Sequence, residues 1–363
     1  MNPYQDLPSN AFWRPAIAER SMFDVDELWN PKFDITKKTK FSTYGSCFAQ
    51  HIGKALARNG YDWLATEQAL TVTSDELKKK YNYGVFTSRT GNIYTTSLLK
   101  QWVDWCSHTL PAPTEIWQDG DRFYDPFRPA VEPNGFASEE ELHASRQHTI
   151  SCFKRSIKRA DCFVFTLGLT ESWCNKNTGL EYPMCPGTVA GIYDETIHGF
   201  KNLTFQEVYD NLRAAIEKML QLNPKLKFLL TVSPVPLTAT YSEKHVLVAT
   251  VYSKSILRAV AGTLANEMDQ VDYFPSYEII TSPTFKGVFF GPNQRSVMQA
   301  GVDFVMSQFF RSIGDAQDEH NRKPDRRNSS ARARRANRQK RITKGSDEVC
   351  EEELLDAFGG GHS

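Results

Sequence analysis

The stretch KFSTYGSCFAQHIGKALARNGYDW, residues 40–63, joins a strand-like run to a helix-like run through a turn of small residues. Its first residues alternate in polarity as a strand does, and Gly45 interrupts the alternation. From Ser46 onward, apolar side chains recur at helical spacing until Gly60, a residue that suits the end of a helix. Ser46 and Cys47 therefore stand side by side where a strand turns into a helix.

The same alternation of strands and helices continues along the chain. Short apolar runs at 161–168 and 226–234 are typical of strands buried in a parallel sheet. Two capping-box signatures predict helices that begin at Ser138 and Thr204. Further helices are expected at 74–81, 93–105, 243–268 and 295–310, and a last strand at 271–279. Strands that alternate with helices indicate an α/β fold with a mainly parallel sheet and helices on both faces.

Composition divides the chain of 363 residues into three parts. We expect an N-terminal extension over 1–37, one domain over 38–312 and a tail over 313–363. Two insertions, near 111–136 and 174–203, interrupt the domain, and the first is rich in Pro, Asp and Gly. Parallel α/β sheets bind ligands at the carboxyl ends of their strands, so the stretches that follow the expected strands should meet at one edge.

The tail is strongly charged although the whole chain has no net charge. Between 322 and 344, eleven Lys or Arg stand against one Asp, whereas 345–363 holds six acids and no Lys or Arg. The basic run has almost no apolar residues, so we expect it to be disordered. Its charge favours an anionic partner, which is nucleic acid, an anionic lipid or an acidic protein. A solubilising tail without any partner is the alternative.

The scattered cysteines and the absence of familiar motifs limit the class of protein to which this chain can belong. Seven cysteines are scattered without a C-x-x-C pair, which favours a reducing compartment over a zinc site or a disulfide framework. No apolar run approaches the roughly 18–20 residues that span a bilayer, and the N-terminus does not resemble a secretory signal. We therefore expect a cytoplasmic protein without a transmembrane segment. The sequence contains no H-E-x-x-H, G-x-G-x-x-G or Walker motif, so we expect no metal and no cofactor.

Ser46 and Cys47 are the candidates for a nucleophile. At the first turn of a helix, free N–H groups and the positive end of the helix dipole stabilise a thiolate or an alkoxide. A strand, a tight turn, a nucleophile and a helix in this order form a nucleophile elbow, although the sequence is not G-x-S-x-G. The alternative is a serine N-cap followed by a buried cysteine that behaves as a small apolar residue.

The segment TYGSCFA, residues 43–49, resembles the signature of the GSCFA family. Three further stretches are similar to the same family: FTLGLTESW at 165–173, PVPLTATYSEKHVLVATVYSKSILRA at 234–259 and DYFPSYEI at 272–279. The likeness covers about residues 38–310. The family resembles the SGNH or GDSL-like hydrolases, which are three-layer α/β/α proteins with a flavodoxin-like sheet. The resemblance implies an ester hydrolase or acyltransferase that works through a covalent acyl-enzyme on an O-acyl group. The substrate is then an acylated small molecule, a glycan or a glycan precursor.

The resemblance also assigns the nucleophile. In the G-D-S block of the SGNH superfamily, the nucleophile stands two places after the glycine. Counted from Gly45, that place belongs to Cys47, whereas Ser46 takes the place of the acid. Ser46 is the nucleophile if the turn is shifted by one residue. We favour Cys47, because a thiol at a helix N-terminus ionises readily.

The remaining parts of the superfamily's site are altered in this chain. TLGLTE resembles the G-x-N-D block that helps to hold an oxyanion. Gly168 matches its glycine, while Thr170 stands in place of Asn and Glu171 in place of Asp. A threonine hydroxyl can donate to an oxyanion as the amide does. Gly91 and Asn92 are the candidates for a second donor, and the alternative for both segments is an ordinary turn.

The base is the part of the site that departs furthest from the superfamily. Its D-x-x-H block follows the last strand, but this chain has no histidine between His245 and His320. His245 opens a helix after a strand loop and is our candidate base, with Glu278 to orient it. His51 and His198 are the other candidates. A helix cap on the surface is the alternative for His245, and a non-catalytic saccharide-binding protein, tethered by its basic tail, is the alternative function.

Overall fold

The computed structural model describes residues 2–315 and 351–359. The chain divides into two compact units, one of residues 1–34 and 278–348 and the other of residues 35–277 and 349–363. The second unit holds the sheet and every candidate site residue except Glu278. Most of the predicted tail, residues 316–350 and 360–363, lies outside the described residues, so its expected disorder and its partners stay predictions.

The second unit contains strands β1 (Lys40–Gly45), β2 (Asp62–Trp63), β3 (Trp117–Asp119), β4 (Arg122–Tyr124), β5 (Cys162–Leu167), β6 (Glu171–Asn175), β7 (Glu181–Tyr182), β8 (His198–Asn202), β9 (Lys227–Val232) and β10 (Val271–Tyr273). Its helices are α1 (Phe48–Arg58), α2 (Asp75–Lys80), α3 (Thr96–Cys106), α4 (Glu139–Arg159), α5 (Phe205–Leu222), α6 (Val246–Glu267) and the short η7 (Glu351–Phe358). Helix α7 (Ser276–Thr281) crosses the boundary between the units. The first unit contains η1 (Pro3–Asp6), η2 (Ser9–Ala11), η3 (Arg14–Ala18), η4 (Met22–Asp24), η5 (Pro283–Phe285) and α8 (Gln299–Ser312).

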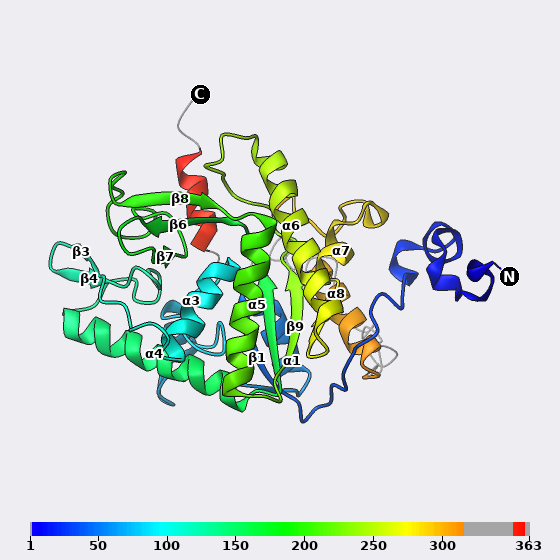
Figure 1. Ribbon diagram of the computed structural model, residues 1–363, viewed down its shortest axis with the longest axis horizontal. Coiled ribbons are helices and arrows are strands. Elements are labelled where there is room, and N and C mark those ends of the chain that lie inside the picture. The colour runs from blue at the N-terminus through cyan, green and yellow to red at the C-terminus, as the bar shows by residue number, and fades with distance from the viewer. Residues whose placement is uncertain (1, 316–350, 360–363) are drawn as a thin grey trace, which may run out of the picture. The chain divides into compact units, whose positions relative to one another are not determined.

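Five strands form a parallel sheet in the order β10-β9-β5-β1-β2 (Figure 1). From β1 the chain first moves to β2 on one side, and later moves through β5 and β9 to β10 on the other. Because parallel crossovers are right-handed, α1 covers one face of the sheet, and α5 and α6 cover the other. The expected three-layer α/β/α sandwich is therefore confirmed. The strand order reverses between β1 and β5, the place where doubly wound sheets bind ligands.

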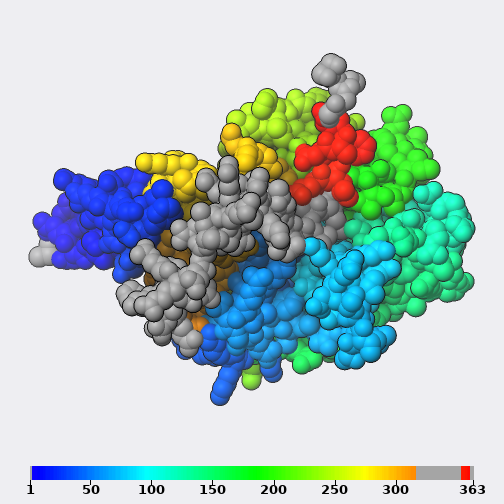
Figure 2. Space-filling view, turned by 180° about the vertical axis from the view of Figure 1, so that it is seen from behind, coloured from blue at the N-terminus to red at the C-terminus, as the bar shows by residue number. Residues whose placement is uncertain are grey.

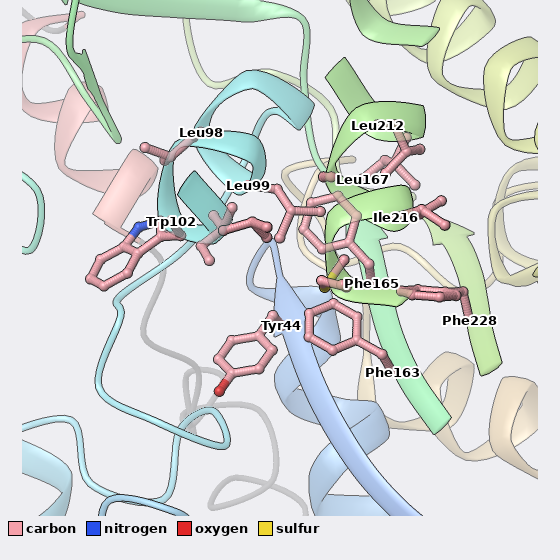
Figure 3. Close-up of a cluster of buried hydrophobic side chains, with 14 of the residues drawn as sticks. Tyr44, Leu98, Leu99, Trp102, Phe163, Phe165, Leu167, Leu212, Ile216 and Phe228 are labelled. Carbon is pink, nitrogen blue, oxygen red and sulfur yellow. The ribbon is translucent and has the colours of Figure 1, made fainter. Parts of the chain in front are cut away.

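Large aromatic side chains fill the layer between the sheet and helices α3–α6 (Figure 3). Phe163 and Phe165 of β5, Phe228 of β9, Tyr44 of β1 and Trp102 of α3 are all buried in this layer. The ring of Tyr44 stacks on that of Phe163 at 5.3 Å between centroids. Each such side chain contributes roughly 1.5–3 kcal/mol by leaving water, so this layer fixes the position of the strand ends.

The capping-box signatures mark helix starts as the sequence predicts. Ser138 accepts the backbone N–H of Glu141 at the start of α4, and Thr204 accepts that of Glu207 at the start of α5. In α5 the carboxylate of Glu207 also accepts the backbone N–H of Thr204. These local hydrogen bonds satisfy N–H groups that a helix cannot bond itself.

The last strand is shorter than the sequence suggests. β10 ends at Tyr273, and Pro275 interrupts the expected run over 271–279 because proline has no N–H for a strand ladder. Ser276 then begins α7, so Glu278 lies in a helix and not directly after a strand.

Both insertions form small antiparallel sheets that pack on one another (Figure 2). The first holds the β3–β4 hairpin, and the second holds a three-stranded sheet in the order β7-β6-β8. The ring centroids of Trp117 and Tyr182 lie 5.4 Å apart, and Asn175 donates to the Glu115 carboxylate at 3.1 Å. β6, which leads into the second insertion, begins at Glu171 shortly after β5 ends at Leu167, so this small sheet borders the reversal point of the strand order.

The first insertion is also tied to α4 by buried charges. The Asp125 carboxylate is fully buried and accepts from Arg128 at 2.8 Å and from Arg146 at 2.9 Å. Burial opposes ionisation of Asp125, but the two guanidinium groups prevail and lower its pKa. The insertion is therefore held by an ion pair network that needs all three partners.

Gly45 is the residue on which the turn from β1 to α1 depends, and its replacement gives a direct test. Its φ is +130°, and a Cβ there would lie 2.3 Å from the carbonyl oxygen of Thr166 on β5. We expect Gly45→Ala to lower the free energy of unfolding in urea by about 3 kcal/mol, because the overlap is with the backbone of a neighbouring strand. Gly60→Ala is the control: its φ of +74° is strained, but nothing lies within 4 Å, so about 1–2 kcal/mol is expected. If both variants lost the same free energy of unfolding, the prediction would be contradicted, because β1 and β5 would then separate easily enough to accommodate a Cβ.

Candidate active site

The turn after β1 is fixed by backbone hydrogen bonds to two neighbouring segments. The N–H of Ser46 donates to the carbonyl of Thr166 on β5 at 3.0 Å. The N–H of Ile93 donates to the carbonyl of Gly45 at 2.9 Å. The segment before α3 is thereby held against the turn, at the reversal point of the strand order.

Gly168 forms the contact between the end of β5 and this turn. Its N–H donates to the carbonyl of Tyr94 at 2.9 Å. A Cβ at this position would lie 3.0 Å from that carbonyl oxygen and 3.2 Å from the Cβ of Ser46. The side chain of Ser46 therefore lies directly against the backbone of Gly168, and a larger residue would push the two segments apart.

Both candidate nucleophiles are buried. Ser46 is 2% exposed, and its Oγ has no hydrogen-bond partner among the described residues. Leaving a buried hydroxyl without a partner costs about 1–3 kcal/mol, so such a group calls for a functional explanation. Cys47 is 3% exposed and directly precedes the first residue of α1. Both side chains are therefore largely shielded from solvent.

Helix α6 holds the loop after β5 with two consecutive side chains. Lys254 is 2% exposed, and its Nζ donates to the carbonyl of Gly168 at 2.6 Å. Ser253 accepts the backbone N–H of Thr170 at 3.0 Å. Sequence reasoning missed both residues. The available signal was a lysine on an apolar helix face, since Leu257 follows Lys254 at helical spacing and is buried.

The block that resembles G-x-N-D has its polar groups already engaged. The Thr170 hydroxyl donates to the side-chain oxygen of Asn202 at 2.7 Å. The Glu171 carboxylate accepts from the Thr240 hydroxyl at 2.6 Å, and burial raises the pKa of Glu171. In this arrangement the Gly168–Glu171 segment joins the parallel sheet to the second insertion, and its assigned oxyanion role stays a prediction.

Gly91 and Asn92 lie in the segment that contacts the turn. Gly91 has a φ of +70°, and Asn92 is buried. The next residue, Ile93, makes the hydrogen bond to Gly45. The structure therefore brings these two candidates to the same strand ends as Ser46 and Gly168.

The candidate base His245 lies apart from the turn. It is exposed, and its Nδ1 accepts the backbone N–H of Leu247 at 3.2 Å, so it caps α6. Nine residues separate it from Lys254, which corresponds to about 13 Å along a helix. Lys254 rather than His245 is thus the α6 side chain that contacts the Gly168 loop.

The other candidate acids and bases have separate surroundings. His198 lies in β8, where its Nδ1 accepts the backbone N–H of Asp194 at 3.0 Å, and burial lowers its pKa. The ring of His51 packs on Phe48 within α1. Glu278 lies in α7, at the boundary where the first unit resumes, and its assigned orienting role stays a prediction.

Comparison with known proteins agrees with this architecture. A model of the GSCFA family matches residues 40–309. The chain belongs to the GSCFA family. No curated protein and no solved structure matches it. The GSCFA signature itself, residues 45–49, is the turn that the Gly45, Ile93 and Gly168 contacts hold in place.

The described part of the GSCFA chain lacks two features, a membrane-spanning helix and a cluster of metal ligands. Among residues 2–315 and 351–359, no helix combines the length and the apolar composition needed to cross a membrane. In the same ranges, no three His, Cys, Asp or Glu side chains gather in a group that could hold a metal ion.

One acid beside the GSCFA site predicts a pH dependence of stability. Glu181 of β7 is buried, and its carboxylate accepts a hydrogen bond from the Thr95 hydroxyl. Its backbone N–H donates to the side-chain oxygen of Gln101 at 2.8 Å, and its carbonyl accepts from the Gln101 amide nitrogen at 2.9 Å. Burial raises the pKa of Glu181 from 4.5 to about 7, although hydrogen bonds from Ser97 and Thr95 act against this shift. At a pH between these two pKa values, the folded chain keeps the proton on Glu181, whereas the unfolded chain has lost it.

We therefore expect the free energy of unfolding to fall as the pH rises from about 4.5 to about 7, by up to about 3 kcal/mol. Glu181→Gln should remove this part of the fall, as measured by urea unfolding at pH 5 and pH 8. Glu207→Gln is the control, because the pKa of that helix-capping acid is lowered and not raised. A Glu181→Gln profile parallel to that of the wild type would contradict the prediction.

Proposed function

We propose that this GSCFA protein is an ester hydrolase or acyltransferase that acts on an O-acyl group through a covalent acyl-enzyme. The acyl group belongs to a small molecule, a glycan or a glycan precursor. One observation carries the proposal: the Ser46 hydroxyl is buried, lacks a hydrogen-bond partner among the described residues and lies where the strand order reverses. A reactive hydroxyl at a helix start suits attack on an acyl carbon.

The nucleophile would attack the carbonyl carbon and leave negative charge on its oxygen. The first N–H groups of α1 and the positive end of its dipole suit that oxyanion. The sequence favours Cys47 as the nucleophile, whereas the contact between Ser46 and Gly168 favours Ser46. The same proposal includes a cytoplasmic location and an anionic partner for the basic run at 322–344, both of which rest on the sequence.

A second function, a non-catalytic saccharide-binding protein, is favoured by a specific observation. Ser46 and Cys47 are both covered, and His245 caps a helix at a distance from them. Such a protein would keep the fold of the site without any turnover, and the basic run would serve as its tether.

Covalent labelling separates these possibilities. We expect a fluorophosphonate to label Ser46 in the full chain, as located by peptide mass spectrometry. Ser46→Ala should reduce labelling and acyl-ester turnover by roughly 10³-fold or more, since the nucleophile itself is removed. Ser42→Ala is the matched control, because Ser42 is also buried with an Oγ that lacks a partner among the described residues, but it lies within β1.

Cys47 is tested in parallel with iodoacetamide and with Cys47→Ala. If Cys47→Ala abolishes turnover and Ser46→Ala only impairs it, the nucleophile is the thiol. If neither reagent modifies the turn and no ester is cleaved, the enzyme proposal is wrong and the binding function is favoured.

A further inference from the structure

Acyl transfer to a serine requires a group that accepts the hydroxyl proton. The histidine that the sequence nominated, His245, is exposed and occupied as a helix cap. Lys254 is the buried titratable side chain that reaches the residue against which Ser46 packs. Lysine serves as the base in place of histidine in some serine hydrolases, so this placement has chemical meaning.

We propose that Lys254 is the general base of the site and that Ser46 and Lys254 work as a serine–lysine pair. This inference rests on the acyl-transfer function proposed above. It replaces His245 in that role and leaves Glu278 without a part in the reaction.

The geometry behind the proposal centres on Gly168. Its carbonyl oxygen lies 2.6 Å from the Nζ of Lys254, and the position of a Cβ on it lies 3.2 Å from the Cβ of Ser46. Both side chains thus contact one small residue. The lysine side chain has four rotatable bonds, so its amine can leave the carbonyl and approach the hydroxyl. Catalytic hydrogen bonds often form fully only when the substrate is bound.

The chemical step balances without any further reagent. As the Oγ of Ser46 bonds to the acyl carbon, its proton passes to the neutral amine of Lys254. The tetrahedral intermediate then expels the alcohol, and the Lys254 ammonium returns the proton to the alcohol oxygen as the C–O bond breaks. In the second half, water or an acceptor hydroxyl attacks the acyl-enzyme, gives its proton to Lys254 and releases Ser46, which recovers the proton.

A purely structural lysine is the competing explanation. In that case Lys254 only ties the Gly168 carbonyl to α6, as Ser253 ties the Thr170 N–H. The two roles differ in what a substitute must do. A structural role needs a cationic donor, whereas a base needs a side chain that can lose a proton.

Arginine separates the two roles, because Lys254→Arg keeps a cationic donor for Gly168 but cannot accept a proton. We expect Lys254→Arg and Lys254→Met each to slow fluorophosphonate labelling of Ser46 in the full chain by roughly 10²–10⁴-fold. Ser253→Ala is the matched control, because Ser253 is the neighbouring residue of α6 and hydrogen-bonds the same loop, and it should slow labelling by less than about tenfold. Labelling of Lys254→Arg at the wild-type rate would overturn the proposal and leave Lys254 a positioning residue.

A rescue experiment covers the case in which Lys254→Arg is misfolded, which its melting curve would reveal. Lys254→Ala leaves space at Gly168, and added ethylamine should restore part of its labelling rate. If ethylamine does not accelerate the labelling of Ser46 in a folded Lys254→Ala variant, the proposal is also overturned. Failure of the proposed function looks different, because the wild type itself would then not be labelled at Ser46.

Discussion

The contact of Gly45 with Thr166 is the constraint on which the site depends. A side chain at residue 45 would overlap the backbone of β5, so β1 and β5 come together only because this residue is glycine. That approach lets Ser46 donate its N–H to Thr166 and sets its side chain against Gly168. The chain thereby presents its candidate nucleophiles at the reversal point of the strand order, where the loops of a doubly wound sheet diverge.

Four polar groups of the loop after β5 have partners inside the protein. The Gly168 N–H and carbonyl, the Thr170 N–H and the Thr170 hydroxyl are all hydrogen-bonded to Tyr94, Lys254, Ser253 and Asn202. Buried polar groups are ordinarily satisfied in this way, because an unmade hydrogen bond costs free energy. The Ser46 hydroxyl differs from these groups, because it is buried without a hydrogen-bond partner among the described residues, as is the Thr166 hydroxyl. Lys254 is the nearby buried amine.

The second insertion connects this site to the rest of its unit. Its three-stranded sheet begins with β6, immediately after Thr170, and the outer strand β7 is fixed by the pairing of Glu181 with Gln101 of α3. The loop before α6 reaches back to it, because Thr240 donates to Glu171 and the Tyr241 ring lies 5.0 Å from that of Trp173. The insertion is therefore tied both to α3 and to the loop before α6.

The sequence by itself determined the layered fold, the glycine turn and the helix starts at Ser138 and Thr204. These features depend on residues that are neighbours along the chain, and the family signature lies within one of them. Only the tertiary structure decided the surroundings of the candidate base. His245 and Lys254 lie on one helix, and their roles follow from which of its faces packs against a loop 86 residues earlier in the chain. A sequence pattern gives the period of a helix, but contacts between distant segments choose which side chain enters the site.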